Sequence, residues 1–191
     1  MSTRESIIQL ADQLIRDKGY NAFSFYDIAK TLGIKNASIH YYFPGKAQLG
    51  IAVIEHHSQR LQVLKQGVAG LPPLEKVKAF VHTYAQTHLE ERICLVGSLA
   101  SALHTLEPAI GQQLKTYSKE VLDWLEEVLE EGKQTADFSF TLPARTKALM
   151  IITNLLAALQ LTRLTGAHDF NTIAETIIQE LCPVPQKEKQ T

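Results

Sequence analysis

The chain contains little of what marks several classes of protein. Its 191 residues include two cysteines, Cys94 and Cys182, which are too few for a disulfide framework and lack the spacing of metal ligands. No signal-peptide pattern is found, because Arg4 and Glu5 lead directly into an amphipathic segment. The most apolar run, residues 148–161, contains polar interruptions and is shorter than the roughly 20 residues that span a membrane. We therefore expect a soluble, cytoplasmic protein that meets no membrane and needs no cofactor or metal.

A catalytic constellation cannot be recognised either. No nucleophile, general base and orienting group stand out together, and neither His56 with His57 nor His82 with His88 has the i, i+4 spacing of a helical metal site. The formal net charge of −1 provides no overall field that would attract a polyanion. The sequence thus predicts a protein that is not an enzyme.

Apolar residues recur at helical spacing along the whole chain, and no strand-like alternation is sustained. We therefore predict an all-α fold. A first helix contains Ile7 and Leu14 and ends at Gly19, and a long fourth helix covers residues 46–68. It is followed by the helix-breaking sequence Leu71-Pro72-Pro73. Further helices are expected over residues 74–91, 93–105, 108–131, 143–165 and 170–182.

Two short helices joined by one glycine lie between the first helix and the fourth. Ser24 followed by Asp27 fits a capping box at the start of the second helix. Gly33 can then take the backbone around a tight turn, since glycine tolerates positive φ. A third helix follows over residues 36–43. This arrangement predicts a helix-turn-helix within an N-terminal three-helix domain of residues 1–46.

The third helix has one apolar face and one face that suits DNA. Ile39 and Phe43 lie four residues apart and are expected to face the other helices. The opposite face carries Asn36, Ala37, Ser38, His40 and Tyr41. An asparagine can pair with adenine, an alanine methyl can contact thymine, and the hydroxyl and imidazole groups can reach base edges or phosphates. Lys35 and Lys46 flank the helix and can neutralise phosphates. We predict insertion into the major groove of double-stranded DNA.

A set of short motifs falls in a fixed order between Ser24 and Leu49. They are the Ser24 cap, Asp27-Ile28-Ala29, Leu32-Gly33-Ile34, Ile39-His40-Tyr41-Tyr42-Phe43 and Lys46-Ala47-Gln48-Leu49. With them, residues 4–56 resemble the N-terminal DNA-binding domain of the TetR/AcrR family of transcriptional regulators. The resemblance implies that DNA is contacted by Tyr26, Asn36, Ala37, Ser38, His40, Tyr41, Tyr42 and Lys46. Two positions depart from the family pattern: His40 replaces a usual tyrosine, and Tyr26 stands where a basic residue is common.

The resemblance also implies a homodimer. Residues 47–70 would form a connecting helix, and residues 71–191 a helical domain for dimerisation and for binding a small-molecule effector. The apolar stripes expected at the dimer interface are Leu149, Ile152, Leu156 and Leu159 in one helix, and Ile173, Ile177 and Leu181 in the next. Two apolar helices at the end of a chain suit a four-helix contact with a symmetry mate. Burial of both helices within one subunit is the alternative.

Candidate effector-binding residues are aromatic or polar side chains along the C-terminal helices. They are Phe80, Tyr84, His88, Cys94, Tyr117, Trp124 and Asn154. Such groups provide polar contacts in an otherwise apolar cavity, although aromatic residues at helical spacing can equally be core. Residues 93–100 resemble a cysteine-containing stretch of a family subgroup that includes sensors of electrophiles. For Cys94 the alternative is a buried, inert thiol.

These observations predict a sequence-specific DNA-binding transcriptional regulator, a repressor that a small-molecule effector releases from its operator. Two alternatives stay open from the sequence. One is a helical small-molecule-binding protein or enzyme whose DNA-binding domain is vestigial. The other is a structural dimer that binds partners through residues 143–182.

Overall fold

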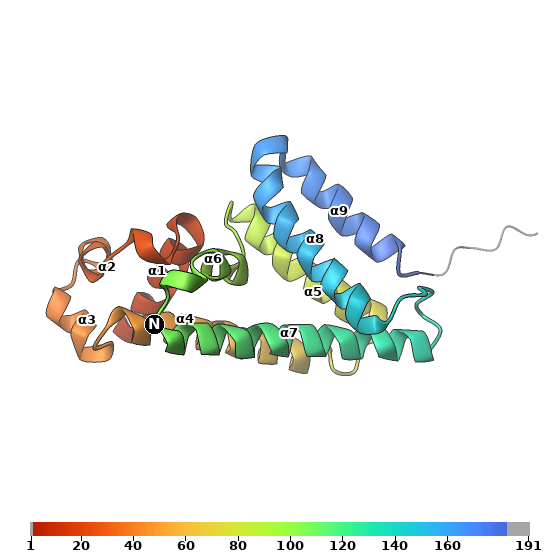
Figure 1. Cartoon of the computed structure of the whole chain (residues 1–191), viewed down its shortest axis with the longest axis horizontal. Helices are drawn as coiled ribbons and strands as arrows, with labels where there is room; N and C mark the ends of the chain where they lie inside the picture. Colours follow the sequence, from red (N-terminus) through yellow and green to blue (C-terminus); the bar gives the residue numbers. More distant parts are fainter. Residues whose placement is uncertain (1, 183–191) are drawn as a thin grey trace, which may run out of the picture. The chain divides into compact units, whose positions relative to one another are not determined.

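The computed structural model describes residues 2–182, and all regular structure within that range is helical. The first elements are α1 (Thr3–Lys18), the 3₁₀ turn η1 (Tyr20–Ala22), α2 (Phe25–Leu32), α3 (Asn36–Tyr42) and α4 (Lys46–Val68). They are followed by α5 (Pro73–Leu89), α6 (Leu95–Ser101), the 3₁₀ turn η2 (Leu103–Thr105), α7 (Pro108–Gln134), α8 (Ala144–Thr165) and α9 (Ala167–Gln179) (Figure 1). The predicted all-α class is confirmed, and the fourth helix has the predicted bounds.

The single helix predicted over residues 93–105 is wrong. α6 ends at Ser101, and η2 follows after Ala102. The carbonyl of Ala102 accepts both the backbone N–H and the hydroxyl of Thr105, each at 2.8 Å. A threonine side chain that bonds nearby backbone in this way competes with the helical pattern. The same hydroxyl accepts the amide of Asn21 at 2.7 Å, which ties η2 to the turn after α1.

Contacts between the helices divide the chain into two compact units. The first unit contains the described residues up to Lys65 together with Thr87–Val121. The second contains Gln66–Gln86 and the described residues from Leu122 onward. The first half of α7 therefore belongs to the first unit, and its second half belongs to the second unit. This division groups α6 and the start of α7 with the helix-turn-helix.

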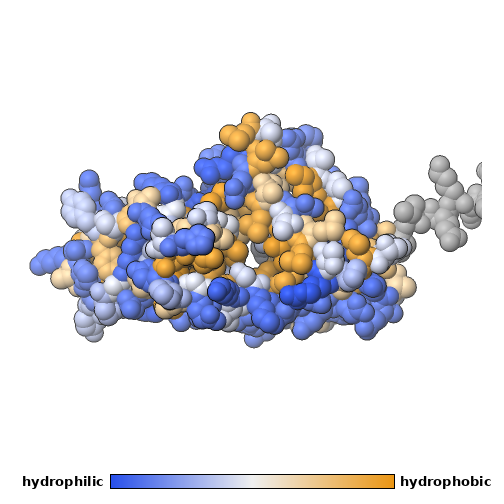
Figure 2. Space-filling view, in the orientation of Figure 1, coloured by the Kyte–Doolittle hydropathy of each residue, from blue (hydrophilic) through white to orange (hydrophobic). Residues whose placement is uncertain are grey.

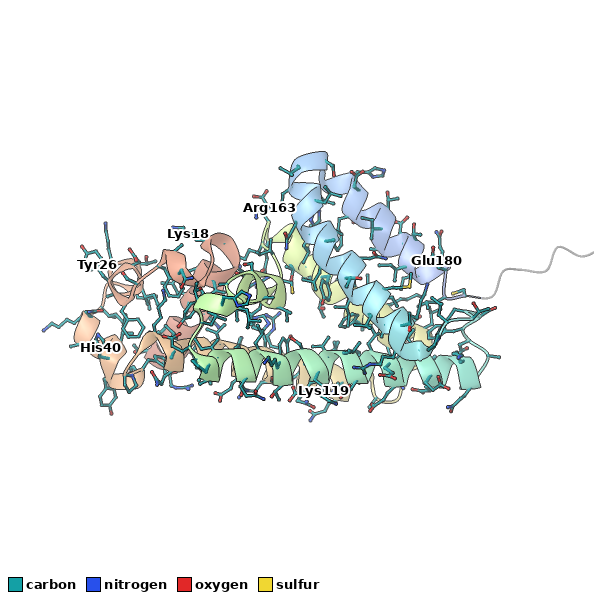
Figure 3. The ribbon with its side chains drawn as sticks, viewed as in Figure 1. Lys18, Tyr26, His40, Lys119, Arg163 and Glu180 are labelled. Carbon is teal, nitrogen blue, oxygen red and sulfur yellow. The ribbon has the colours of Figure 1, made fainter. Side chains whose placement is uncertain are left out.

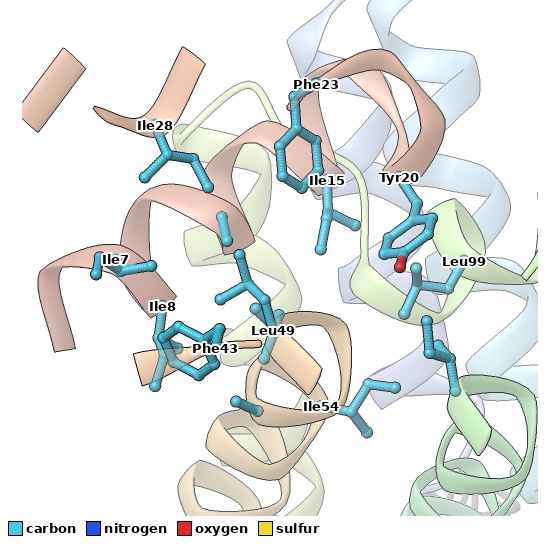
Figure 4. Close-up of a cluster of buried hydrophobic side chains, with 14 of the residues drawn as sticks. Ile7, Ile8, Ile15, Tyr20, Phe23, Ile28, Phe43, Leu49, Ile54 and Leu99 are labelled. Carbon is cyan, nitrogen blue, oxygen red and sulfur yellow. The ribbon is translucent and has the colours of Figure 1, made fainter. Parts of the chain in front are cut away.

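The core of the first unit is built by α1 to α4 and completed by α6 and α7. Its fully buried side chains include Ile7, Ile15, Ile28, Ile39, Leu49, Ile54, Leu95, Leu99 and Ile110. Figure 4 shows the side chains of α1 and α4 meeting Leu99 of α6 and the ring of Tyr20. Two segments far apart in sequence thus share one apolar core, which fixes the helix-turn-helix to the residues that precede α7.

The second unit contains α8 and α9 as an antiparallel pair, together with most of α5 and the second half of α7 (Figure 1). Buried charges are paired here: the ammonium of Lys76 lies 2.7 Å from Glu131, and that of Lys147 lies 3.0 Å from Glu180. The ring of Phe138 packs directly on α7, where a β-carbon added to Gly132 would lie 2.0 Å from it. The segment after α7 is therefore anchored to that helix by an aromatic side chain.

One helix of the described residues, α8, is long and apolar enough to cross a membrane by length and composition alone. Core helices of soluble proteins meet the same criterion. Eight of the 22 residues of α8 are buried inside the unit, including Ile151, Leu155 and Leu159.

Candidate nucleic-acid interface

The first helix of the motif, α2, begins at a hydrogen-bonded cap. The backbone N–H and the hydroxyl of Ser24 both donate to the carboxylate of Asp27 at 2.7 Å. These hydrogen bonds lower the pKa of Asp27, which keeps a negative charge in the first turn, where the helix dipole favours it. The predicted capping box is confirmed. It fixes where α2 begins.

The turn between α2 and α3 depends on Gly33, whose φ of +65° lies in the left-handed region. The N–H of Ile34 donates to the carbonyl of Ala29 at 3.0 Å and closes the end of α2. A β-carbon at this φ is strained, so the sharp turn into α3 needs glycine. The predicted turn is confirmed.

The structure leaves the predicted groove-reading residues of α3 outside the core, around the part of the helix that Ile39 and Phe43 do not occupy. Ile39 is fully buried and Phe43 is 2% exposed, so both belong to the core. The exposed residues are Lys35, Asn36, Ala37, His40, Tyr41 and Tyr42, with Ser38 half-buried among them. Tyr41 projects furthest, at 82% exposed. Tyr26 of α2 is also exposed, and Figure 3 shows its position relative to His40 within this helical motif.

Two ring contacts organise this surface. The imidazole of His40 meets the ring of Phe25 edge to face at 5.0 Å between centroids. Tyr41 and Tyr42 make a similar contact, also at 5.0 Å. Edge-to-face pairs of this kind add about 0.5–1.5 kcal/mol beyond the burial of their area. The contacts restrict the rings and so prepare the surface before any ligand binds.

Lys46 is placed differently from the other predicted DNA contacts. Its ammonium donates a hydrogen bond to the carbonyl of Phe23, and it lies over the rings of Phe23 and Tyr20 at 4.2 Å and 4.8 Å from their centroids. Burial lowers the pKa of Lys46. Nothing in the local sequence around Lys46 indicates this inward position, because both of its partners precede α2.

A buried polar cluster joins α1 to α4 and to the segment before α6. The carboxylate of Asp12 lies 2.7 Å from Nε2 of His57 on α4 and 3.2 Å from the guanidinium of Arg16. Arg16 also donates from Nε to the carbonyl of Ile93 at 3.0 Å and from Nη2 to the hydroxyl of Thr87 at 3.2 Å. Separating these elements would leave buried charge without a partner, which is costly. Sequence reasoning did not find this cluster, because its members come from segments far apart in the chain.

The predicted effector-binding residues fall in both units. In the second unit, the ring of Phe80 lies 5.3 Å from that of Tyr84 and 5.9 Å from that of Trp124, whereas Asn154 is exposed on α8. The first unit holds His88, Cys94 and Tyr117. Burial raises the pKa values of the Cys94 thiol and the Tyr117 hydroxyl. A raised pKa keeps the Cys94 thiol protonated near neutrality and therefore less nucleophilic.

The predicted dimer-interface residues also differ in exposure. Leu159, Ile177 and Leu181 are at most 5% exposed and pack inside the second unit. They were expected to face a partner, but a stripe defined by helical spacing does not show which neighbour covers it. Leu149 is 45% exposed. Ile152, Leu156 and Ile173 are half-buried.

A capped helix, a glycine turn and a short second helix with a polar, aromatic outer face define a helix-turn-helix DNA-binding protein. Comparison with known proteins agrees. Residues 7–53 match the family described as bacterial regulatory proteins, tetR family. The crystal structure of a TetR transcriptional regulator from Legionella pneumophila is 33% identical, covering 95% of this chain and 98% of that one, with a TM-score of 0.85. The chain therefore belongs to the TetR family of transcriptional regulators.

Further relatives carry more specific names. The HTH-type transcriptional repressor NemR of Escherichia coli K12 is 25% identical over 72% of either chain. An uncharacterised HTH-type transcriptional regulator of Lactococcus lactis is 30% identical, and the chain spans 61% of its length. The fold of AibR, solved in complex with isovaleryl coenzyme A and operator DNA, is similar at a TM-score of 0.72 and 19% identity.

Proposed function

We propose that this chain is a homodimeric repressor that binds a palindromic operator in the cytoplasm and is released from it by a small-molecule effector. The observation that carries the proposal is the exposed face of α3, on which Asn36, Ala37, His40 and Tyr41 stand clear of the core. A short helix of this kind fits the major groove, and its residue types suit base edges and phosphates. The repressor name of NemR and the operator complex of AibR support this role.

The dimer is proposed from the surface of α8. Apolar and small residues are exposed along one stripe of the helix: Leu149, Met150, Thr153, Ala157, Leu161 and Leu164. Figure 2 shows apolar surface on the second unit, where α8 meets α9. A stripe of this length on a helix that already packs against α9 suits a self-complementary contact with a second copy. Two copies would hold their recognition helices about 34 Å apart, one turn of DNA.

Release by an effector requires that DNA and effector favour different conformations, so that each weakens binding of the other. We assign operator binding to residues 1–46, connection to residues 47–70, and effector binding and dimerisation to residues 71–191. The buried cluster around Asp12 and Arg16 supports coupling between operator binding and effector binding, because it joins α1 to Thr87 and Ile93 by hydrogen bonds. The ring of Tyr117 lies next to this cluster, because its centroid is 6.2 Å from that of the His57 ring.

The test is a fluorescence-anisotropy titration against DNA from upstream of the gene that encodes the chain, at two salt concentrations. Wild-type protein should bind one fragment with strongly salt-dependent affinity. The double substitution Asn36→Ala with Tyr41→Ala should abolish specific binding and leave the dimer intact. Val63→Ala, which alters an exposed residue of α4, is the matched control and should bind normally.

The outcomes separate the alternatives. Unchanged operator affinity in the double variant would contradict the assignment of the site. Absence of any salt-sensitive DNA binding in the wild type would favour a small-molecule-binding protein with a vestigial motif. A large apolar surface still exposed in the dimer would favour a partner-binding role.

A further inference from the structure

Two basic side chains, those of Arg4 and Lys46, lie beside the C-terminal end of α3. The Lys46 ammonium is bound by protein groups, whereas Arg4 is exposed. Phe43 follows α3 directly and caps it, since its N–H donates to the carbonyl of Ile39 at 2.8 Å. Arg4 of α1 places its guanidinium 5.3 Å from the centre of the Phe43 ring. Lys46 opens α4 three residues later, within the same small region.

The ammonium of Lys46 is already occupied. It donates to the carbonyl of Phe23 and lies over two rings that are themselves almost fully buried, those of Phe23 and Tyr20. To reach a phosphate, Lys46 would have to give up both cation–π contacts and leave that carbonyl without this donor. The burial that lowers its pKa points to the same inward position. These contacts join the start of α4 to the connection between α1 and α2.

The guanidinium of Arg4 is exposed, and the residues from 2 to 182 place no carboxylate within ion-pair distance of it. Its guanidinium carbon lies over the ring of Phe43, 5.3 Å from the centroid. A ring contact of this kind uses no hydrogen-bond donor, so the five N–H donors of the guanidinium stay available to a phosphate. An arginine held over a ring in this way has less rotamer entropy left to lose when it meets a phosphate.

We propose that Arg4 neutralises a DNA phosphate beside the C-terminal end of α3, and that Lys46 instead positions the start of α4 by holding Phe23 and Tyr20. The inference rests on the proposed operator binding and assigns a contact to a residue outside the helix-turn-helix. The phosphate contact is made once per protomer. A dimer on its operator therefore has two of them.

The salt dependence of binding distinguishes a phosphate contact from a positioning role. Each neutralised phosphate adds roughly 0.9 to the slope of log K against log salt. We would measure that slope with the full-length dimer on the fragment bound by wild type. Arg4→Gln should reduce its magnitude by about 2 per dimer and weaken operator and non-operator DNA alike. Arg4→Lys should restore most of the slope, because the charge returns.

Lys46→Met keeps the aliphatic stem and removes the charge. It should leave the slope unchanged while lowering the melting temperature, as expected for a residue that positions α4. Arg163→Gln removes an exposed charge of α8 and is the control for overall charge; its slope should match wild type. Circular dichroism of every variant verifies that it is folded.

A slope unchanged by Arg4→Gln, or a slope reduced by about 2 in Lys46→Met, would overturn the inference. Acetylation with acetic anhydride followed by peptide mass spectrometry tests Lys46 without substitution. Its labelling rate should be the same with and without DNA, whereas protection that appears only with DNA would contradict the proposal. Loss of salt-dependent binding in the wild type itself would contradict the proposed function and is recognised before any variant is compared.

Discussion

The carboxylate of Asp12 and the imidazole of His57 lie 2.7 Å apart, and this contact joins α1 to α4 inside the first unit. The two residues are 45 positions apart in sequence. Arg16 extends the contact from the same carboxylate to the segment before α6. The cluster is buried, so its charges act in a medium where an unpaired group is costly.

Asp12→Asn should therefore destabilise the protein strongly. Removing one partner of a buried charged pair typically costs about 3–5 kcal/mol. Arg16 keeps a second carboxylate, that of Glu90 at 3.4 Å, so we expect a cost near the lower end of that range. Urea denaturation at fixed protein concentration measures the change. Asp17→Asn is the matched control on the same helix, since Asp17 makes an exposed ion pair with Arg92 at 3.2 Å. It should cost at most about 1 kcal/mol.

The same carboxylate predicts a pH dependence. Burial acts to raise the pKa of Asp12, but the hydrogen bond and charge of His57, with help from Arg16, outweigh it and lower the pKa below 3.8. A lowered pKa in the folded state means that the contribution of Asp12 is complete above the unfolded-state value and is lost as pH falls through the folded-state value. The stability gap between wild type and Asp12→Asn should thus narrow below about pH 4. A gap that widens there would contradict the assignment.

Substitution by alanine should change stability in opposite directions at two glycines with different surroundings. A β-carbon at Gly132 would lie 2.0 Å from the ring of Phe138, whereas one at Gly67 meets nothing within 4 Å. Gly132→Ala should cost about 1–3 kcal/mol through overpacking. Gly67→Ala should gain about 0.5 kcal/mol, because alanine restricts the unfolded chain. Equal effects in thermal unfolding would show that Phe138 moves aside freely.

The proposed dimer predicts a specific sensitivity on α8. Leu161, at 54% exposed, lies in the apolar stripe, and Val63 of α4 is 69% exposed outside it. Leu161→Glu should shift sedimentation velocity profiles toward monomer and weaken operator binding. Val63→Glu introduces the same charge and should leave the dimer unchanged. A dimer that persists in Leu161→Glu would show that the interface lies outside this stripe.

Cys94 should react slowly in the folded protein. Burial raises the pKa of its thiol, so little thiolate exists near pH 7, and the side chain is half-buried. Alkylation by iodoacetamide, followed by peptide mass spectrometry, should be at least about tenfold slower in native protein than in urea. Fast native alkylation with loss of operator binding would favour a sensing role for this cysteine.

The sequence was most informative where local chemistry decides the structure. Ser24 with Asp27 and the turn glycine Gly33 marked the bounds of α2, and they lie where predicted. α4 ends at Val68, before the pair Pro72-Pro73, as expected. These features depend on residues within a few positions of one another, so their spacing alone carries the information.

Features set by distant neighbours were not predictable in this way. A helical stripe placed Ile177 and Leu181 on an apolar face but could not show that the same protomer covers them. Lys46 matched a family position, yet its ammonium direction is set by Phe23 and Tyr20 from an earlier segment. The partner of Asp12 depends on how α1 and α4 pack, which no local pattern encodes.

The shared core of the first unit has a consequence for engineering. Leu95 and Leu99 of α6 and Ile110 of α7 are fully buried against α1 to α4. A chimera cut after the helix-turn-helix would expose those faces on both fragments and discard the bonds between Arg16 and the segment before α6. The helix-turn-helix is therefore not a domain that can be transferred on its own. A workable graft onto another regulator would have to carry α6 and the start of α7 with it.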